Sequence, residues 1–102
     1  MSAPPEVIDA PDANRYEARF GDTLAGFAQY IRTAELIAFV HTEVDPAFEG
    51  QGVGGALVRT SLDAARAAGT QVLAVCPFYT AWIARHPEYQ DLLYSKRSRV
   101  SD

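Results

Sequence analysis

The chain has 102 residues, of which 48% are hydrophobic and 22% charged, a balance typical of one globular domain and too apolar for a disordered chain. A single cysteine excludes an intramolecular disulfide framework and a cysteine-rich zinc site, and the net charge of −4 argues against a dedicated nucleic-acid-binding protein. No apolar run approaches the roughly 20 residues that span a bilayer, and residues 1–14 hold three acids and no base, so we expect a cytoplasmic protein with no membrane contact and no signal peptide.

The first half of the chain contains three strand-like segments. Residues 1–14 hold three prolines and little periodicity, so we expect a flexible N-terminal segment there. Strands are expected over residues 16–20, 23–32 and 35–44. The Gly21-Asp22 pair suits a tight hairpin turn, because glycine accepts positive φ. Tight turns of this kind make neighbouring strands antiparallel.

The third of these strands changes character along its length. Alternation predicts one core face, and a second face that begins apolar and ends polar where the strand leaves the core for a cleft. The predicted core face consists of Leu36, Ala38, Val40, Thr42 and Val44, and the other of Ile37, Phe39, His41 and Glu43.

Pro46 ends this strand, and a glycine-rich loop follows. A helix is then expected over residues 56–68, where apolar residues recur at helical spacing. A short apolar strand over residues 71–75 and a second helix from Pro77 to just before Pro87 complete the pattern. A right-handed crossover makes the third and fourth strands parallel.

The predicted order β-β-β-α-β-α defines the fold class. It is an α/β domain over residues 15–94 whose mixed sheet is mostly antiparallel, with one parallel strand pair and flanking helices. A basic tail over residues 95–102 follows this domain.

Four of the seven glycines, Gly50, Gly52, Gly54 and Gly55, lie within six positions between a strand and a helix. Glycines let the backbone curl so that successive N–H groups point at one anion, and the first helical turn adds unpaired N–H groups and a positive dipole end. We therefore interpret the segment as a phosphate site rather than a flexible turn. It is not a P-loop, because no Gly-Lys-Ser/Thr follows, and a dinucleotide-binding fold needs a longer parallel sheet.

Within this loop, Gln51, Gly54 and Ala56 meet the pattern Gln/Arg-x-x-Gly-x-Gly/Ala, which resembles the pyrophosphate loop of the GNAT superfamily of acetyl-CoA-dependent N-acyltransferases. Further segments resemble a compact, single-domain GNAT subfamily, so that the resemblance covers roughly residues 15–94. They are His41-Thr-Glu-Val44, Val75-Cys-Pro-Phe78, Trp82-Ile83 and Arg85-His-Pro-Glu-Tyr89. The helices that larger members carry between the first and second strands are absent and replaced by Gly21-Asp22, which implies an open acceptor cleft.

The resemblance implies acetyl-CoA as cosubstrate and no metal. In the family, the two parallel strands splay apart and pantetheine lies in the gap. By resemblance, backbone groups of Thr42 and Val44 would pair with the pantetheine amides, as an unpaired strand edge allows. Backbone N–H groups of the loop would hold the pyrophosphate, and they belong to Gln51, Gly52, Val53, Gly54, Gly55 and Ala56.

Acetyl transfer to an amine requires a base, and His41 and Glu43 share one side of the third strand, one pleat apart. Either can take the ammonium proton directly or through water. His41 can instead be a structural residue that bonds a backbone carbonyl, and Glu43 a solvated carboxylate or a backbone cap. The Val44 N–H can polarise the thioester carbonyl.

Cys76 ends the fourth strand, beside the expected thioester and directly before the second helix. It is a candidate acetyl-accepting nucleophile, a CoA contact that does not react or that forms a mixed disulfide with CoA when oxidised, or a small buried hydrophobe. Many larger GNAT enzymes have a tyrosine general acid on the helix that follows. Here residues 81–84 have no hydroxyl, and Tyr79 lies earlier on that helix.

The leading hypothesis is a CoA-dependent N-acetyltransferase that acts on a primary amine of a small molecule or peptide. Its alternative is a non-catalytic module that binds CoA or acyl-CoA, which the missing acceptor helices and tyrosine keep open. A third hypothesis is a purely structural interaction domain, which predicts no affinity for CoA. The acidic balance favours a cationic acceptor, and we expect a monomer or weak dimer.

Overall fold

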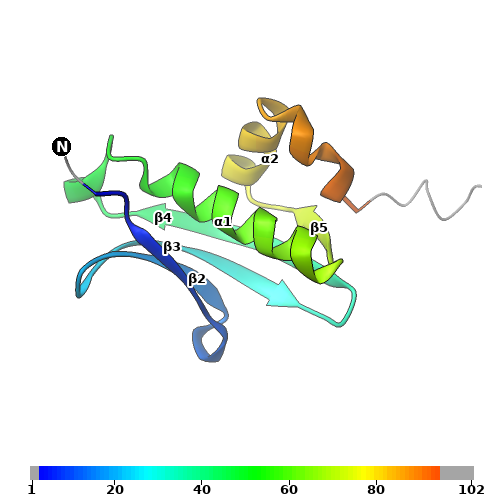
Figure 1. Cartoon of the computed structure of the whole chain (residues 1–102), viewed down its shortest axis with the longest axis horizontal. Helices are drawn as coiled ribbons and strands as arrows, with labels where there is room; N and C mark the ends of the chain where they lie inside the picture. Colours follow the sequence, from blue (N-terminus) through cyan, green and yellow to red (C-terminus); the bar gives the residue numbers. More distant parts are fainter. Residues whose placement is uncertain (1–2, 95–102) are drawn as a thin grey trace, which may run out of the picture.

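The computed structural model describes residues 3–94, which form a mixed five-stranded sheet with helices beside it (Figure 1). The strands lie side by side in chain order and are β1 (Glu6–Ala10), β2 (Arg15–Phe20), β3 (Thr23–Arg32), β4 (Leu36–Val44) and β5 (Gln71–Ala74). The helices are α1 (Val53–Ala68) and α2 (Pro77–Ala84), and short 3-10 turns occur at η1 (Pro11–Ala13), η2 (Pro46–Phe48) and η3 (Pro87–Leu92). The predicted basic tail, residues 95–102, lies outside the described residues.

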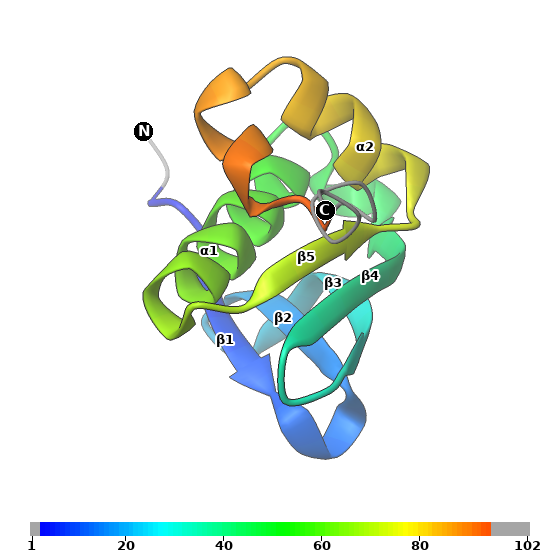
Figure 2. The same cartoon turned by 90° about the vertical axis from the view of Figure 1, so that its right-hand side faces the viewer.

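The sheet confirms the predicted fold class. The strands β1 to β4 are antiparallel to their neighbours, whereas β4 and β5 are parallel and joined through α1. The helix α1 crosses one face of the sheet, and α2 and η3 pack beside α1 at the β5 end (Figure 2). No helix of residues 3–94 covers the opposite face. Neither helix in this part of the chain has the length and hydropathy needed to cross a membrane.

The expectation of a flexible segment over residues 1–14 is wrong for its described part, because β1 pairs antiparallel with β2 along all five of its residues. The Asp9 carboxylate accepts hydrogen bonds from the Tyr30 hydroxyl at 2.5 Å and from Arg32 at 3.0 Å, which ties β1 to β3. The first and second strands are therefore joined by η1 and left-handed Asn14, while Gly21 turns β2 into β3.

The predicted faces of the strand at residues 35–44 are wrong in its first half. Ile37 and Phe39 are buried under the helices, with 3% and 0% of their surface exposed. The register moves from Gln29 opposite His41 to Tyr30 opposite Phe39, so Val40 has no partner and forms a bulge. A bulge exchanges the two faces of a strand. Thr42 and Val44 therefore return to the helix side, and His41 and Glu43 lie on the helix-free face.

The helix α1 begins at Val53, three residues earlier than predicted, so the second half of the glycine loop is its first turn. Gly69 ends the helix in a left-handed conformation, with φ of 72°, and its N–H bonds the last turn. The buried side of the helix follows the expected three-to-four-residue spacing and consists of Val53, Leu57, Val58, Ser61, Leu62 and Ala65.

Candidate functional site

The glycine loop presents free backbone donors at the start of α1. Gly50 and Gly52 have φ of 82° and 80°, a left-handed conformation that only glycine adopts readily. The first bond of the helix runs from the Ala56 N–H to the Gly52 carbonyl at 3.0 Å, so the N–H groups of Val53, Gly54 and Gly55 lie before it and have no partner in the helix. Among residues 3–94, no side chain makes a capping hydrogen bond at this end.

Two of the six predicted pyrophosphate donors already have internal partners. The Gln51 N–H donates to the Phe48 carbonyl at 3.3 Å, and the Ala56 N–H makes the first helical bond. The donors available to an anion are thus those of residues 52–55, directed along the positive end of the α1 dipole. This geometry fits a phosphate or pyrophosphate group.

Phe78 was not predicted as a site residue, yet its ring lies against this helical turn. A Cβ added to Gly54 would come within 2.6 Å of the Phe78 Cζ atom. The φ of Gly54 is not positive, so its missing side chain is needed for this close approach rather than for backbone freedom. Phe78 is 41% exposed. The sequence marks Phe78 only by its place after Cys76-Pro77.

The strands β4 and β5 separate at Cys76. The N–H groups of Val75 and Cys76 both donate to the Phe39 carbonyl, at 3.1 Å and 2.8 Å, and α2 begins at the next residue, Pro77. Since β5 turns away there, the last residues of β4, through Val44, lie beyond the ladder with β5 and leave a free strand edge. The Cys76 side chain is buried and donates to the Thr42 hydroxyl at 3.4 Å.

His41 and Glu43 form a pair on the other face of the same strand. The His41 Nε2 atom lies 2.8 Å from a carboxylate oxygen of Glu43, and both side chains are more than half exposed. The Phe27 ring lies beside the His41 ring, with centroids 6.1 Å apart. The three predicted catalytic residues therefore do not form one group. His41 and Glu43 are exposed on the helix-free face of β4, whereas Cys76 is buried against Thr42 on the other face.

Tyr79 belongs to the core. Its hydroxyl pairs with the Ser61 hydroxyl at 2.7 Å, and its ring stacks on Phe39 at 4.3 Å between centroids. Burial raises the pKa of Tyr79 well above its usual range. With no exposed surface, this tyrosine is held away from any bound substrate.

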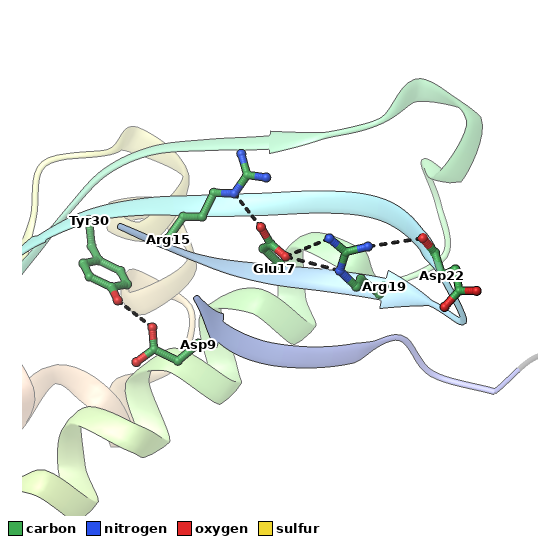
Figure 3. A network of polar contacts seen from close by, with 6 residues as sticks. All are labelled: Asp9, Arg15, Glu17, Arg19, Asp22 and Tyr30. Atoms are coloured by element: carbon green, nitrogen blue, oxygen red, sulfur yellow. Dashed lines mark hydrogen bonds and ion pairs between the residues drawn. The ribbon is translucent and has the colours of Figure 1, made fainter. Parts of the chain in front are cut away.

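A second polar network on the helix-free face was not predicted. Glu17 on β2 accepts from Arg15 Nε at 2.8 Å and from Arg19 Nη2 at 2.9 Å (Figure 3). The residue is buried, and the hydrogen bond from Arg15 is the main cause that holds the pKa of its carboxyl below the usual value. The alternation Arg15-x-Glu17-x-Arg19 was the available signal. No group of three potential metal ligands occurs in residues 3–94.

The model of the GCN5-related N-acetyltransferase family matches residues 15–92, the region that contains the loop, the β4 edge and Cys76. The chain belongs to this family. Acetyl-CoA is the acyl donor of the family, and the free donors at residues 52–55 fit its pyrophosphate.

Individual relatives support the assignment over parts of their length. The N-alpha-acetyltransferase RimI of Mycobacterium tuberculosis is 43% identical over 63 residues, which is 58% of this chain and 40% of that protein. A GCN5-like N-acetyltransferase structure from Staphylococcus aureus shares the fold, with a TM-score of 0.66, 22% identity and 88% of each chain covered. Rv2747 from Mycobacterium tuberculosis, solved in complex with CoA, has a TM-score of 0.58 and 28% identity over 76% of this chain and 50% of its own.

Proposed function

We propose that this protein is an N-acetyltransferase that transfers an acetyl group from acetyl-CoA to a primary amine. The observation that carries the proposal is one continuous feature: the free donors of residues 52–55, then the free β4 edge, then Cys76 where β4 and β5 separate. An anion site that leads into an open strand edge matches a ligand with a phosphate end and an amide-bearing arm. The match to Rv2747, solved with CoA, supports it.

The chain would hold CoA by its backbone. The N–H groups of Gly52 to Gly55 would bind the pyrophosphate, and the β4 backbone at Thr42 and Val44 would pair with the pantetheine amides. When bound, acetyl-CoA supplies an acetyl thioester. Cys76 and Thr42 then form the wall at the end of the slot.

The His41–Glu43 pair would prepare the amine. The Glu43 carboxylate accepts a proton from the ammonium, and His41, bonded to it at 2.8 Å, holds the carboxylate and can pass the proton to water. The amine nitrogen forms the new bond to the acetyl carbon as the carbon–sulfur bond breaks. The ammonium loses two protons, of which one ends on the CoA sulfur and the other in solvent. The Val44 N–H lies on the free edge of β4 and would polarise the thioester carbonyl.

Binding and turnover test the proposal separately. Acetyl-CoA at 100 times its Kd should stabilise the fold by roughly 2.7 kcal/mol, which a thermal shift detects. Release of CoA is then measured over a broad amine panel of amino acids, peptide N-termini and polyamines. Binding without transfer to any amine would leave the non-catalytic CoA-binding module as the function.

Matched variants assign the residues. Glu43→Gln and His41→Ala should lower kcat by roughly 100-fold while leaving the Kd for acetyl-CoA nearly unchanged, which is the typical effect of losing a general base. Cys76→Ala should retain transfer if the thiol only lines the slot. Loss of transfer in Cys76→Ala, together with an acetylated Cys76 in intact-mass spectra of the wild type, would instead show covalent catalysis.

A further inference from the structure

We propose that the helix-free face of the sheet is the acceptor site and that it selects amines which also carry a carboxylate. The amine would lie at His41 and Glu43, and the carboxylate at Arg15. This inference rests on the proposed function, because it names the class of amine that receives the acetyl group.

A row of side chains crosses β2, β3 and β4 on this face. The strand register places Phe27 between Glu17 and Glu43, and the register places Gln29 between Arg15 and His41. The Arg15 guanidinium carbon lies 4.6 Å from the centre of the Phe27 ring, and the His41 ring lies on the same aromatic side chain at 6.1 Å. One partly buried aromatic ring therefore lies between the Arg15 cation and the His41–Glu43 pair.

Arg15 has hydrogen-bonding capacity left over. Only its Nε atom donates to Glu17, and its two Nη atoms point away from that carboxylate across β3 (Figure 3). No acceptor within residues 3–94 is recorded for these Nη atoms. Two parallel N–H donors on a planar guanidinium match the two oxygens of a carboxylate.

Glu17 does not compete for the amine. Arg15 and Arg19 occupy its two oxygens, and only 10% of its side chain is exposed. The three residues together carry one excess positive charge. Arg19 also donates to the Asp22 carbonyl and stands opposite Glu6, so Arg15 is the cation that faces Phe27. Glu17 is thus a positioning residue, and it fixes Arg15 through the Nε atom.

The other end of the row has the opposite sign. The Glu43 carboxylate is 60% exposed and bonds only the His41 ring among the described residues, so it can also receive an ammonium group. A hollow of about 270 Å³ beside it is lined in part by Gly26, Phe27, Glu43 and Asp45. A zwitterion spanning Phe27 would satisfy both ends, with its carbon chain on the ring.

The test uses isosteric pairs that differ only in charge. Acetylation of γ-aminobutyrate and δ-aminovalerate is compared with acetylation of their primary amides, as kcat/KM in the wild-type protein. The acids should be favoured roughly tenfold or more, the value of a charge-assisted bidentate contact at a partly exposed site. In Arg15→Gln this acid-to-amide ratio should fall toward one.

Arg32→Gln is the matched control, because Arg32 is also paired to a carboxylate in this sheet but on the helix side. It should keep the acid preference of the wild type. A readout apart from activity is the NMR titration of the CoA complex with γ-aminobutyrate, which should shift amides around Arg15, Phe27 and Glu43 and leave those around Arg32 in place.

The outcomes separate the two proposals. Equal acetylation of acids and amides, or an Arg15→Gln protein that keeps the preference, overturns the acceptor site and leaves the proposed function standing. If CoA binds and no amine of the broad panel is acetylated, the proposed function fails and the acceptor site fails with it. Because the wild-type ratio needs no variant, an unfolded Arg15→Gln protein does not prevent a decision.

Discussion

Gly54 lies in the first turn of α1, where its lack of a side chain lets the Phe78 ring of α2 rest against the helix. The glycine pattern correctly predicted a loop followed by a helix, but it started the helix at residue 56 rather than Val53 and did not separate the glycines by cause. Gly52 needs its left-handed φ of 80°, whereas Gly54 needs space for a neighbour. That distinction depends on a contact between residues 24 positions apart, which no local pattern contains.

We expect Gly54→Ala to push the Phe78 ring outward and to cost about 1 kcal/mol of unfolding free energy, the lower end of the range for overpacking, because the ring is partly exposed. In a Phe78→Ala background the same substitution should cost nothing, since no atom remains to be displaced. Urea unfolding of the four proteins gives the coupling energy. Equal costs in both backgrounds would contradict the role assigned to the ring.

Glu17 provides a pH test at a single residue. Its pKa in the folded protein is held below the ordinary 4.5, chiefly by the hydrogen bond from Arg15. The stability that this ion pair adds is therefore present above pH 4.5 and is lost as pH falls through the folded-state pKa. Glu17→Gln should be less stable than wild type by about 1 kcal/mol at pH 7, with the gap closing in acid. Glu35→Gln, at an exposed turn, serves as the control in urea unfolding from neutral to acid pH.

At the scale of elements, local patterns predicted the loop, α1, β5 and α2 in the right order. These elements are set by glycines, prolines and apolar periodicity within short windows, for instance Pro77 at the first position of α2. The elements that the patterns missed depend on distant partners. β1 forms despite its flanking prolines because β2 offers it a pairing edge, and the bulge at Val40 arises from the register between β3 and β4.

The same reason explains which parts of the site were predictable. The alternation along β4 placed His41 and Glu43 on one face, and they do lie 2.8 Å apart. It also placed Phe39 on that face, whereas the structure has Phe39 on the opposite face. The bulge responsible depends on the register between β3 and β4, so the sequence of one strand does not show it. The Cys76–Thr42 contact joins residues 34 positions apart and follows from where β5 ends.

Asp9 tests how firmly β1 is held. The pKa of Tyr30 is raised to about 12, first by burial and then by the hydrogen bond to Asp9. Stability from this contact is complete below pH 10 and is lost as pH rises toward 12. Asp9→Asn should lower the Tyr30 pKa toward 10, which a titration of tyrosine ring carbons by NMR follows. An unchanged Tyr30 pKa would show that Asp9 does not hold the hydroxyl. Asp12→Asn, on the exposed η1 turn, should leave it unchanged.

At the scale of the whole molecule, a helical layer lies on one side of a sheet, and the two faces of the sheet have different roles. The helices cover one face and enclose the core, and η3 is fixed to α1 by the Arg66 bonds to Asp91 and to the Glu88 carbonyl. Within residues 3–94 no helix covers the other face, which leaves side chains of β2, β3 and β4 open to the proposed acceptor. The proposed CoA slot lies where the two layers meet, between the end of β4 and the starts of α1 and α2.

A ligand in that slot would bridge the end of β4 and the first turns of α1 and α2. Bound CoA should therefore slow amide exchange in the first turn of α1, at the end of β4 and in α2 by up to roughly 100-fold at 100 times its Kd. β1 is separated from β4 by β2 and β3, so the amides of β1 and the β1–β2 turn should be slowed only where their exchange requires global unfolding. Hydrogen exchange with and without CoA measures this pattern by segment. Protection confined to β1 and β2 would contradict the assignment of the loop. It would mean that the ligand binds elsewhere and does not contact residues 50–56.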